Sequence, residues 1–183
     1  MPAPGPAADS RADLAALLYG ASHLTGSFVL RSGETASEYF DKYQFESRPD
    51  LLRRIAVALA ALVPADIEVL AGLEMGGIPV ATALSLETGI PAVFVRKRAK
   101  EYGTRRTAEG VEVAGRRVLV IEDVVSSGGQ IVLSSGHLRE AGANVSQALC
   151  VIDRRTPDMQ VLPDAGIELL SLFTVDDLRG PAS

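Results

Sequence analysis

The sequence predicts an α/β fold in which a parallel sheet has helices on both faces and a small N-terminal hood stands beside it. Short apolar segments alternate with segments of helical spacing from about residue 64 onward. The strand segments are apolar throughout, which is typical of strands buried on both faces. Because strand–helix–strand crossovers share one hand, the strand ends meet at one edge of the sheet. Open α/β sheets bind their ligands at that edge.

The individual elements follow from apolar spacing and from helix- and turn-breaking residues. Before the alternation, a helix is predicted over Asp13–Ser22, short strands over Ser27–Leu30 and Glu38–Lys42, and an amphipathic helix over Asp50–Leu62. The alternating part contains the strand Glu68–Ala71, the helix Gly77–Glu87, the strands Ala92–Val95 and Arg117–Ile121, the helix Ser127–Ala141, and the strands Asn144–Ile152 and Glu168–Phe173.

These elements divide the chain into three parts. Residues 1–12 are Pro/Ala-rich and are expected to be a disordered terminus, residues 13–48 a helix and hood, and residues 49–183 the core. No apolar run approaches the ~18 residues needed to span a bilayer, and the start lacks an apolar signal core. We therefore expect a cytoplasmic location and no membrane contact. The single cysteine, Cys150, is expected to be a buried strand residue.

Charge is unevenly distributed. The formal net charge of −5 argues against general nucleic-acid binding. Within the polar stretch Lys97–Val113 and the residue before it, however, lie six of the 18 basic residues. They are Arg96, Lys97, Arg98, Lys100, Arg105 and Arg106. Composition alone leaves two interpretations open, a solvated loop or a site for a small polyanion.

The segment Val118–Gln130 carries the strongest functional signal. Two carboxylates, Glu122 and Asp123, follow an apolar strand, and hydroxyls and glycines then open a helix. Unsatisfied N–H groups at a helix start bind phosphate, whereas a carboxylate accepts hydrogen bonds from a ribose diol. An ordinary helix capped by Ser127 is the alternative. The predicted phosphate contacts are Ser126, Ser127, Gly128, Gly129 and Gln130, and Val124 and Val125, which precede them, are expected to belong to the same ligand site.

This segment resembles the phosphoribosyl pyrophosphate signature of type I phosphoribosyltransferases. No G-x-x-x-x-G-K-[ST] or G-x-G-x-x-G motif points to another nucleotide fold. The resemblance implies the type I phosphoribosyltransferase fold, with Glu122 and Asp123 as catalytic groups that position the ribose. It also implies a Mg²⁺ cofactor held mainly by substrate and water.

Three further segments resemble the orotate branch of that family. Phe28–Gly33 implies that Arg31 contacts phosphates, and Tyr39 and Phe40 would border the planar orotate ring. Asp153–Arg155 resembles an element whose arginine, here Arg154, reaches orotate. By the same resemblance Ser126 also contacts the base.

The third segment, Val95–Gly103, resembles the catalytic loop of the branch. Arg96, Lys97 and Lys100 match, and Tyr102 stands where many members have histidine, as a phosphate hydrogen-bond donor. Such cations stabilise the charge that develops on departing pyrophosphate. The resemblance implies a homodimer in which this loop, with Lys100 as a catalytic group, closes over the neighbouring subunit's site.

One loop departs from the pattern of many bacterial members. Ala71–Gly77 resembles the pyrophosphate-binding loop, but Gly76 stands where those members carry lysine. Backbone N–H groups would then make the pyrophosphate contact, and the departure points to the short form of the enzyme. His23 and His137 fall outside every motif and are expected to be structural.

The implied reaction is the transfer of ribose 5-phosphate from phosphoribosyl pyrophosphate to orotate, giving orotidine 5′-phosphate and pyrophosphate in de novo pyrimidine biosynthesis. Two alternatives remain open. One is a phosphoribosyltransferase for another base, which a panel of bases would distinguish. The other is a non-catalytic regulator that senses phosphoribosyl pyrophosphate and binds nucleic acid, against which the acidic balance counts.

Overall fold

A six-stranded sheet forms the centre of the computed structural model, which describes residues 10–29, 33–97 and 107–179. The strand order is β5-β4-β3-β6-β7-β8, and every neighbouring pair is parallel except β4 with β5. This confirms the predicted fold class. The sheet strands are β3 (Val69–Leu73), β4 (Ala92–Val95), β5 (Ala108–Gly110), β6 (Arg117–Val125), β7 (Asn144–Asp153) and β8 (Glu168–Thr174).

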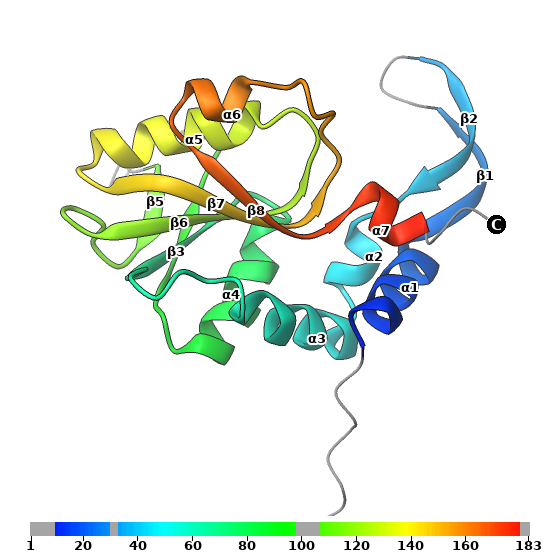
Figure 1. Ribbon diagram of the computed structural model, residues 1–183, viewed down its shortest axis with the longest axis horizontal. Helices are drawn as coiled ribbons and strands as arrows, with labels where there is room; N and C mark the ends of the chain where they lie inside the picture. The colour runs from blue at the N-terminus through cyan, green and yellow to red at the C-terminus, as the bar shows by residue number, and fades with distance from the viewer. Residues whose placement is uncertain (1–9, 30–32, 98–106, 180–183) are drawn as a thin grey trace, which may run out of the picture.

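Helices cover both faces of this sheet (Figure 1). α5 and α6 lie on one face, and α3 and α4 lie on the other. The antiparallel hairpin of β1 (His23–Val29) and β2 (Thr35–Phe40) projects beside the sheet and forms the hood. The helices are α1 (Arg11–Ser22), α2 (Tyr43–Glu46), α3 (Pro49–Ala60), α4 (Gly77–Thr88), α5 (Gly129–Glu140), α6 (Val161–Asp164) and α7 (Val175–Arg179).

Two hydrophobic clusters, one on each side of the sheet, explain why the strands are apolar throughout. Along β6, Leu119 and Ile121 pack into the cluster under α3 and α4, whereas Val118 and Val120 pack into the cluster under α5. All four side chains are at most 1% exposed. Successive strand residues point to opposite faces, so a strand buried on both faces needs an apolar residue at each position. Cys150 is fully buried in β7, as predicted.

The structure corrects several predicted boundaries. α1 begins at Arg11, because Ser10 caps it by accepting the Asp13 N–H in a capping box. β1 begins at His23, and β6 continues to Val125, so the acid pair lies inside that strand. β5 and the short helices α2, α6 and α7 had no expected counterpart. β5 pairs with β4 through its backbone at the sheet edge and therefore needs no apolar pattern.

Within the described parts of the chain, no helix has the length and apolar content needed to cross a membrane. Three predicted site residues, Arg31, Lys100 and Tyr102, lie outside the described residues. The remaining predicted site residues all lie at, or next to, the end of the sheet that faces the hood.

Candidate active site

The acid pair lies in the last third of β6, and its two side chains face opposite sides of the sheet. Asp123 is fully buried, whereas Glu122 is partly exposed and lines a pocket at the start of α5. The backbone N–H of Asp123 donates to Glu122 Oε1 at 3.1 Å, and that of Val124 donates to Asp123 Oδ1 at 2.6 Å. The alternation of strand side chains therefore gives the two carboxylates different surroundings.

Asp123 belongs to a buried charge cluster that the sequence did not predict. Lys42, at the start of α2, places its ammonium nitrogen 2.7 Å from Asp123 Oδ2. Glu46, from the same helix, is only 8% exposed and shares a side-chain hydrogen bond with Asp123. A Cβ on Gly76 would overlap Asp123 Oδ2 and would lie 2.7 Å from Glu46 Oε1. A side chain at Gly76 is therefore excluded by the cluster.

The carboxyl groups of this cluster differ in their proton affinity. Burial, and then the hydrogen bond and charge of Asp123, raise the pKa of both Glu46 and Glu122 to about 9. Burial alone would also raise the pKa of Asp123, but hydrogen bonds from Glu46, Glu122 and Lys42 outweigh burial and lower it. At neutral pH Asp123 is thus the ionised member, paired with Lys42, and the two glutamates are protonated.

The pocket at the start of α5 has a volume of about 190 Å³ and the composition of a phosphate site. Gly128 precedes the helix with φ +83°, a conformation that favours glycine, and it has no side chain with which to cap the helix. A helix start carries unsatisfied N–H groups and a partial positive charge, and this pocket lies beside the start of α5. The lining residues are Glu122, Val124, Val125, Ser126, Ser127, Gly128, Gln130 and Ile131.

The side chains of some residues in the predicted ligand site are engaged elsewhere, which leaves their backbone groups for ligand contact. Val125 is 2% exposed and packs into the core under α5, and Val124 packs on the opposite cluster. The Gln130 side-chain amide donates to Ser134 Oγ at 3.1 Å along the helix. The hydroxyls of Ser126 and Ser127 are exposed, although Ser127 Oγ also accepts the Gly129 N–H at 3.4 Å.

The loop after β3 is packed against the acid pair. A Cβ on Gly77 would overlap the carbonyl oxygen of Ile121 in β6, so only glycine allows this close approach. The loop is tied to the end of β4, since the Glu74 N–H donates to the Val95 carbonyl at 2.8 Å and Glu74 Oε2 accepts the Lys97 N–H at 3.0 Å. The peptide bond between Glu74 and Met75 is cis.

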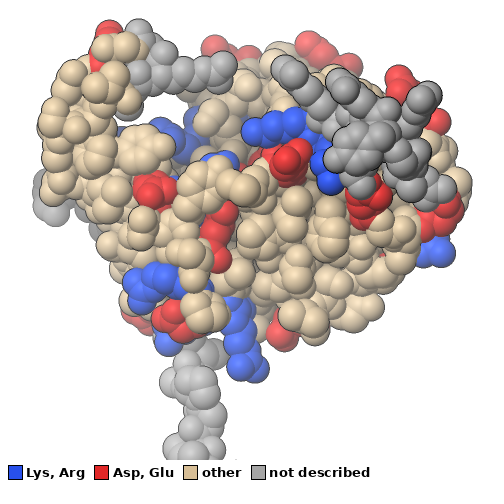
Figure 2. Space-filling model, turned by 180° about the vertical axis from the view of Figure 1, so that it is seen from behind, with Lys and Arg blue, Asp and Glu red and all other residues tan. Residues whose placement is uncertain are grey.

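The described ends of the basic segment are bound to each other. The Arg96 N–H donates to the Thr107 carbonyl at 2.8 Å, and Arg96 Nε lies 3.8 Å from Glu109 Oε1. Lys100 and Tyr102, which are predicted to contact phosphate, lie outside the described residues. Figure 2 shows that basic and acidic side chains are interspersed on the face it presents, including the surface next to the hood.

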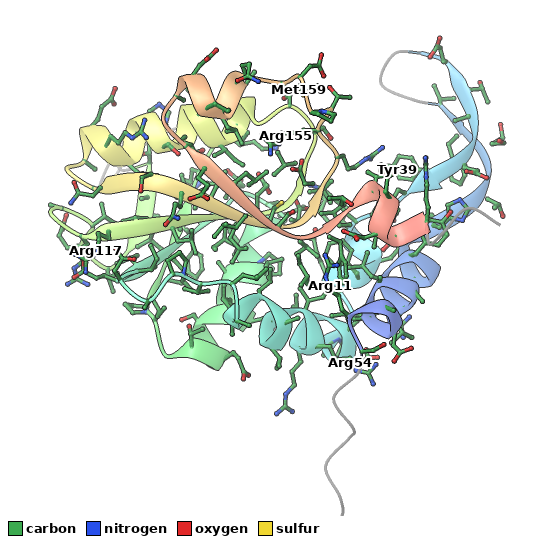
Figure 3. The ribbon with its side chains drawn as sticks, viewed as in Figure 1. Arg11, Tyr39, Arg54, Arg117, Arg155 and Met159 are labelled. Carbon is green, nitrogen blue, oxygen red and sulfur yellow. The ribbon has the colours of Figure 1, made fainter. Side chains whose placement is uncertain are left out.

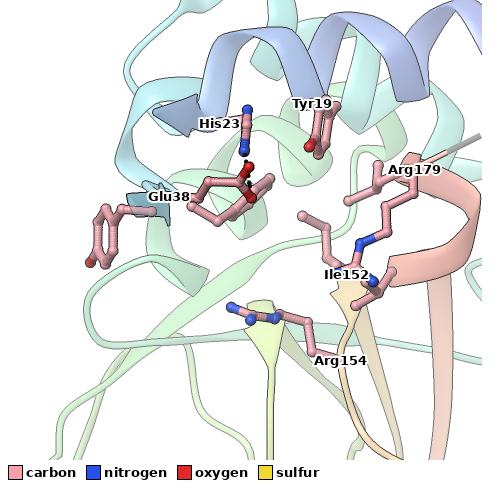
Figure 4. Close-up of a pocket in the computed structure, with 10 residues that line it drawn as sticks. Tyr19, His23, Glu38, Ile152, Arg154 and Arg179 are labelled. Carbon is pink, nitrogen blue, oxygen red and sulfur yellow. Dashed lines mark ion pairs between the residues drawn. The ribbon is translucent and has the colours of Figure 1, made fainter. Parts of the chain in front are cut away.

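Three of the four residues expected to contact the base line one cavity between the hood and the sheet, whereas the fourth, Ser126, lines the pocket at the start of α5. Tyr39 and Phe40 of β2 and Arg154, just after β7, border a volume of about 250 Å³ (Figure 4). Tyr39 is stacked on Phe28 of the neighbouring strand, with ring centroids 5.5 Å apart. Figure 3 shows Tyr39 on the hood side and Arg155 on the sheet side of this region. The structure therefore brings the hood aromatics and the β7 arginine together.

His23 also lines this cavity, although no motif includes it. Its Nε2 lies 3.3 Å from a carboxylate oxygen of Glu38, and its ring is stacked on Tyr19 at 4.7 Å. Lys42 and Glu46 are the other site residues that sequence reasoning missed. A signal existed for Lys42, which is the only Lys or Arg between Arg31 and Arg48. For Glu46 the sequence carries no such signal, because no neighbouring residue in the sequence indicates that its side chain is buried.

Comparisons with known proteins show the family of this chain. Residues 43–165 match the model of the phosphoribosyl transferase domain, so the fold is that of a phosphoribosyltransferase. The orotate phosphoribosyltransferase of a Nocardioides species is 49% identical over 91% of this chain and 93% of its own length. The chain belongs to the orotate phosphoribosyltransferase family.

Solved structures give the same assignment. The orotate phosphoribosyltransferase of Mycobacterium tuberculosis H37Rv superposes with a TM-score of 0.83 at 33% identity, over 92% of this chain and 98% of that chain. Its complex with 5-phospho-alpha-D-ribosyl 1-diphosphate superposes with a TM-score of 0.78 at 30% identity and the same coverage.

Proposed function

We propose that this chain transfers ribose 5-phosphate from phosphoribosyl pyrophosphate to orotate, releasing pyrophosphate and forming orotidine 5′-phosphate. One observation carries the proposal: the base cavity and the phosphate pocket are fixed to each other through neighbouring strands. The Arg154 N–H donates to the Val125 carbonyl at 2.8 Å. The arginine that would recognise the base therefore starts beside the strand end from which the phosphate loop begins.

The sugar phosphate binds at the β6 exit. The exposed hydroxyls of Ser126 and Ser127 and the backbone N–H groups at the start of α5 hold the 5-phosphate. Glu122, which faces this pocket, accepts hydrogen bonds from the ribose hydroxyls, and Asp123 adds an ionised carboxylate on the other side of the strand. Negative charge here favours the partial positive charge that develops at the anomeric carbon.

Pyrophosphate departs toward the loop after β3 and the basic segment. The backbone N–H groups of residues 75–77, together with Arg96, Lys97, Lys100 and the hood residue Arg31, are its proposed partners. Tyr102 would add a hydrogen bond. Cations placed where charge accumulates stabilise the leaving group without reorganising in the transition state.

The residues of the proposed site fit a Mg²⁺ ion that enters together with the substrate. The phosphate pocket is lined by hydroxyls and backbone amides, which bind phosphate oxygens and leave the metal to substrate and water. When bound, Mg²⁺ would neutralise charge on the ribose and pyrophosphate oxygens.

Orotate binds in the cavity under the hood. Tyr39 and Phe40 supply an aromatic wall for its planar ring. The Arg154 guanidinium forms a forked pair with the orotate carboxylate or a ring carbonyl, and Ser126 lies next to the ring. Orotate attacks through a ring nitrogen that is already anionic, so the site needs no strong base. A homodimer would supply Lys100 to the neighbouring subunit's site.

The test is turnover of the purified chain with phosphoribosyl pyrophosphate, Mg²⁺ and a panel of bases, followed by the loss of orotate absorbance. Conversion of orotate, with adenine, guanine and uracil inert, is the expected result. Conversion of a different base would show that the cavity selects another substrate. Binding of phosphoribosyl pyrophosphate without any turnover would favour the regulatory alternative.

A further inference from the structure

Lys42 is the cation that faces the buried carboxyl groups at the floor of the site. Its ammonium nitrogen lies 2.7 Å from Asp123 Oδ2, and the exposed fraction of its side chain is 35%, against 0% for Asp123. Glu122 also acts on its charge, the charge of Lys42 acts on Glu46, and the Tyr43 ring lies 5.4 Å from the ammonium group. These groups come from α2 and β6, the two elements that meet at the cluster.

The cluster is satisfied only in one protonation state. With both groups ionised, Glu46 and Asp123 would be two buried negative charges in contact, and Glu46 Oε1 would have no donor, because Lys42 pairs with Asp123 Oδ2. A proton on Glu46 supplies the donor between the two carboxyl groups, and Lys42 then balances the single remaining charge on Asp123. Without the ammonium group, an uncompensated carboxylate would remain fully buried, and such a group takes up a proton instead.

Lys42 also connects the two halves of the substrate site. It stands two residues after Phe40, which lines the base cavity, and its side chain reaches the strand that carries the ribose acids. The backbone around it is fixed, since the Asp41 N–H donates to the Ser22 carbonyl at 2.8 Å and the Tyr43 N–H donates to Asp41 Oδ1 at 3.1 Å. A rigid turn thus places the ammonium group relative to the hood.

We propose that Lys42 is a positioning residue that keeps Asp123 ionised and in place at the ribose site, and that it couples this site to the base-contacting strand β2. Lys42 acts through Asp123 and need not touch the substrate. The inference rests on the proposed function, because its main measurement uses orotate turnover.

The experiment compares Lys42→Met, which removes the charge and keeps the length, with Lys42→Arg, which keeps the charge. Arg48→Met is the matched control, because Arg48 forms an exposed ion pair with Asp50 at 3.5 Å close by in the sequence. For each protein, kcat and the KM for phosphoribosyl pyrophosphate are measured between pH 4.5 and 9, and folding is checked by circular dichroism and thermal unfolding.

In Lys42→Met, the acidic limb of the pH profile of kcat/KM should lie about 1–3 pH units higher than in the wild type. This is the effect of removing an opposite charge from beside a carboxylate. At pH 7, kcat/KM should fall about ten- to hundred-fold, the scale expected when a site group is misplaced. Lys42→Arg should restore the pH profile, and Arg48→Met should match the wild type.

A purely structural role would lower the unfolding temperature of Lys42→Met but leave the position of its acidic limb unchanged, and that result would overturn the proposal. So would an equal shift of the limb in Lys42→Arg. If Lys42→Met does not fold, the double variant Lys42→Met/Glu46→Gln, which has one fewer buried acid, carries the same comparison against Glu46→Gln alone. An inactive wild type would instead contradict the proposed function.

Discussion

Arg155 forms a forked ion pair with Asp153, in which Nε lies 3.0 Å from Oδ1 and a terminal guanidinium nitrogen lies 2.9 Å from Oδ2. Both side chains are less than one-fifth exposed. The neighbouring Arg154 is exposed and lines the base cavity. Two adjacent arginines thus have separate tasks, one holding the β7 exit in shape and the other available to substrate.

This division predicts opposite effects of two matched substitutions. Arg154→Met should raise the KM for orotate about ten- to hundred-fold, because a charge-assisted hydrogen bond contributes about 1.5–3 kcal/mol, and should leave the unfolding temperature unchanged. Arg155→Met should instead lower the free energy of unfolding by about 1–3 kcal/mol, because Asp153 loses its partner. Steady-state kinetics and urea unfolding measure the two effects. An exchange of the two phenotypes would contradict the assignment.

The protonated glutamates predict a pH dependence of stability. Glu46 and Glu122 have pKa values of about 9 in the folded protein, against about 4.5 as the ordinary value. Between these two pH values the folded state binds more protons than the unfolded state, so the free energy of unfolding should fall as the pH rises. The lowered pKa of Asp123 acts only at more acidic pH.

Thermal unfolding at pH 6 and pH 8.5 checks this dependence. The unfolding temperature should be lower at pH 8.5, and the difference should shrink in Glu46→Gln, which is neutral at both values. Glu87→Gln, on the exposed face of α4, is the control and should keep the wild-type difference. An unfolding temperature that rises with pH over this window would rule out protonated glutamates.

The left-handed backbone at position 128 requires glycine, and a second glycine in α5 allows this requirement to be distinguished from a general effect of helix propensity. Its φ is +83°, and a Cβ would lie 2.8 Å from Leu162 Cγ. Gly128→Ala should therefore destabilise the fold by about 1–3 kcal/mol and weaken the binding of phosphoribosyl pyrophosphate. Gly136→Ala, in the same helix with open space around it, should stabilise by about 0.5–1 kcal/mol. Urea unfolding and isothermal titration calorimetry measure both; equal effects would refute the requirement.

The shared active site of the proposed dimer can be tested by complementation. Lys100→Ala should lower kcat by orders of magnitude while leaving the fold intact, and Asp123→Asn should also be nearly inactive. When equal amounts of the two variants are denatured together and refolded, about half of the dimers should contain one subunit of each variant. Each mixed dimer has one intact site out of two, so the mixture should recover about a quarter of wild-type activity. No recovery, with mixed dimers demonstrated by tagged subunits, would place Lys100 in its own subunit's site.

Much of the fold was predictable because it depends on local patterns. Apolar strands and helical spacing identified the parallel sheet, and the order of acids, hydroxyls and glycines marked the β6–α5 junction as the candidate phosphate site. The edge strand β5 was not predictable, since its pairing with β4 uses only backbone groups. The extent of β6 was also missed, because Glu122 and Asp123 read as a loop signal although they continue a buried strand.

The sequence by itself determined the fold class, and it predicted the phosphate loop and the base-recognition residues Tyr39, Phe40 and Arg154 on which the proposed function depends. Only the tertiary structure decided which acid is ionised. Lys42 and Glu46 stand about 80 residues from Asp123 in the sequence, and they reach it because α2 packs beside β6. A carboxylate's charge depends on burial and on neighbours within a few ångströms. Those neighbours are set by packing between distant segments, which no local pattern reveals.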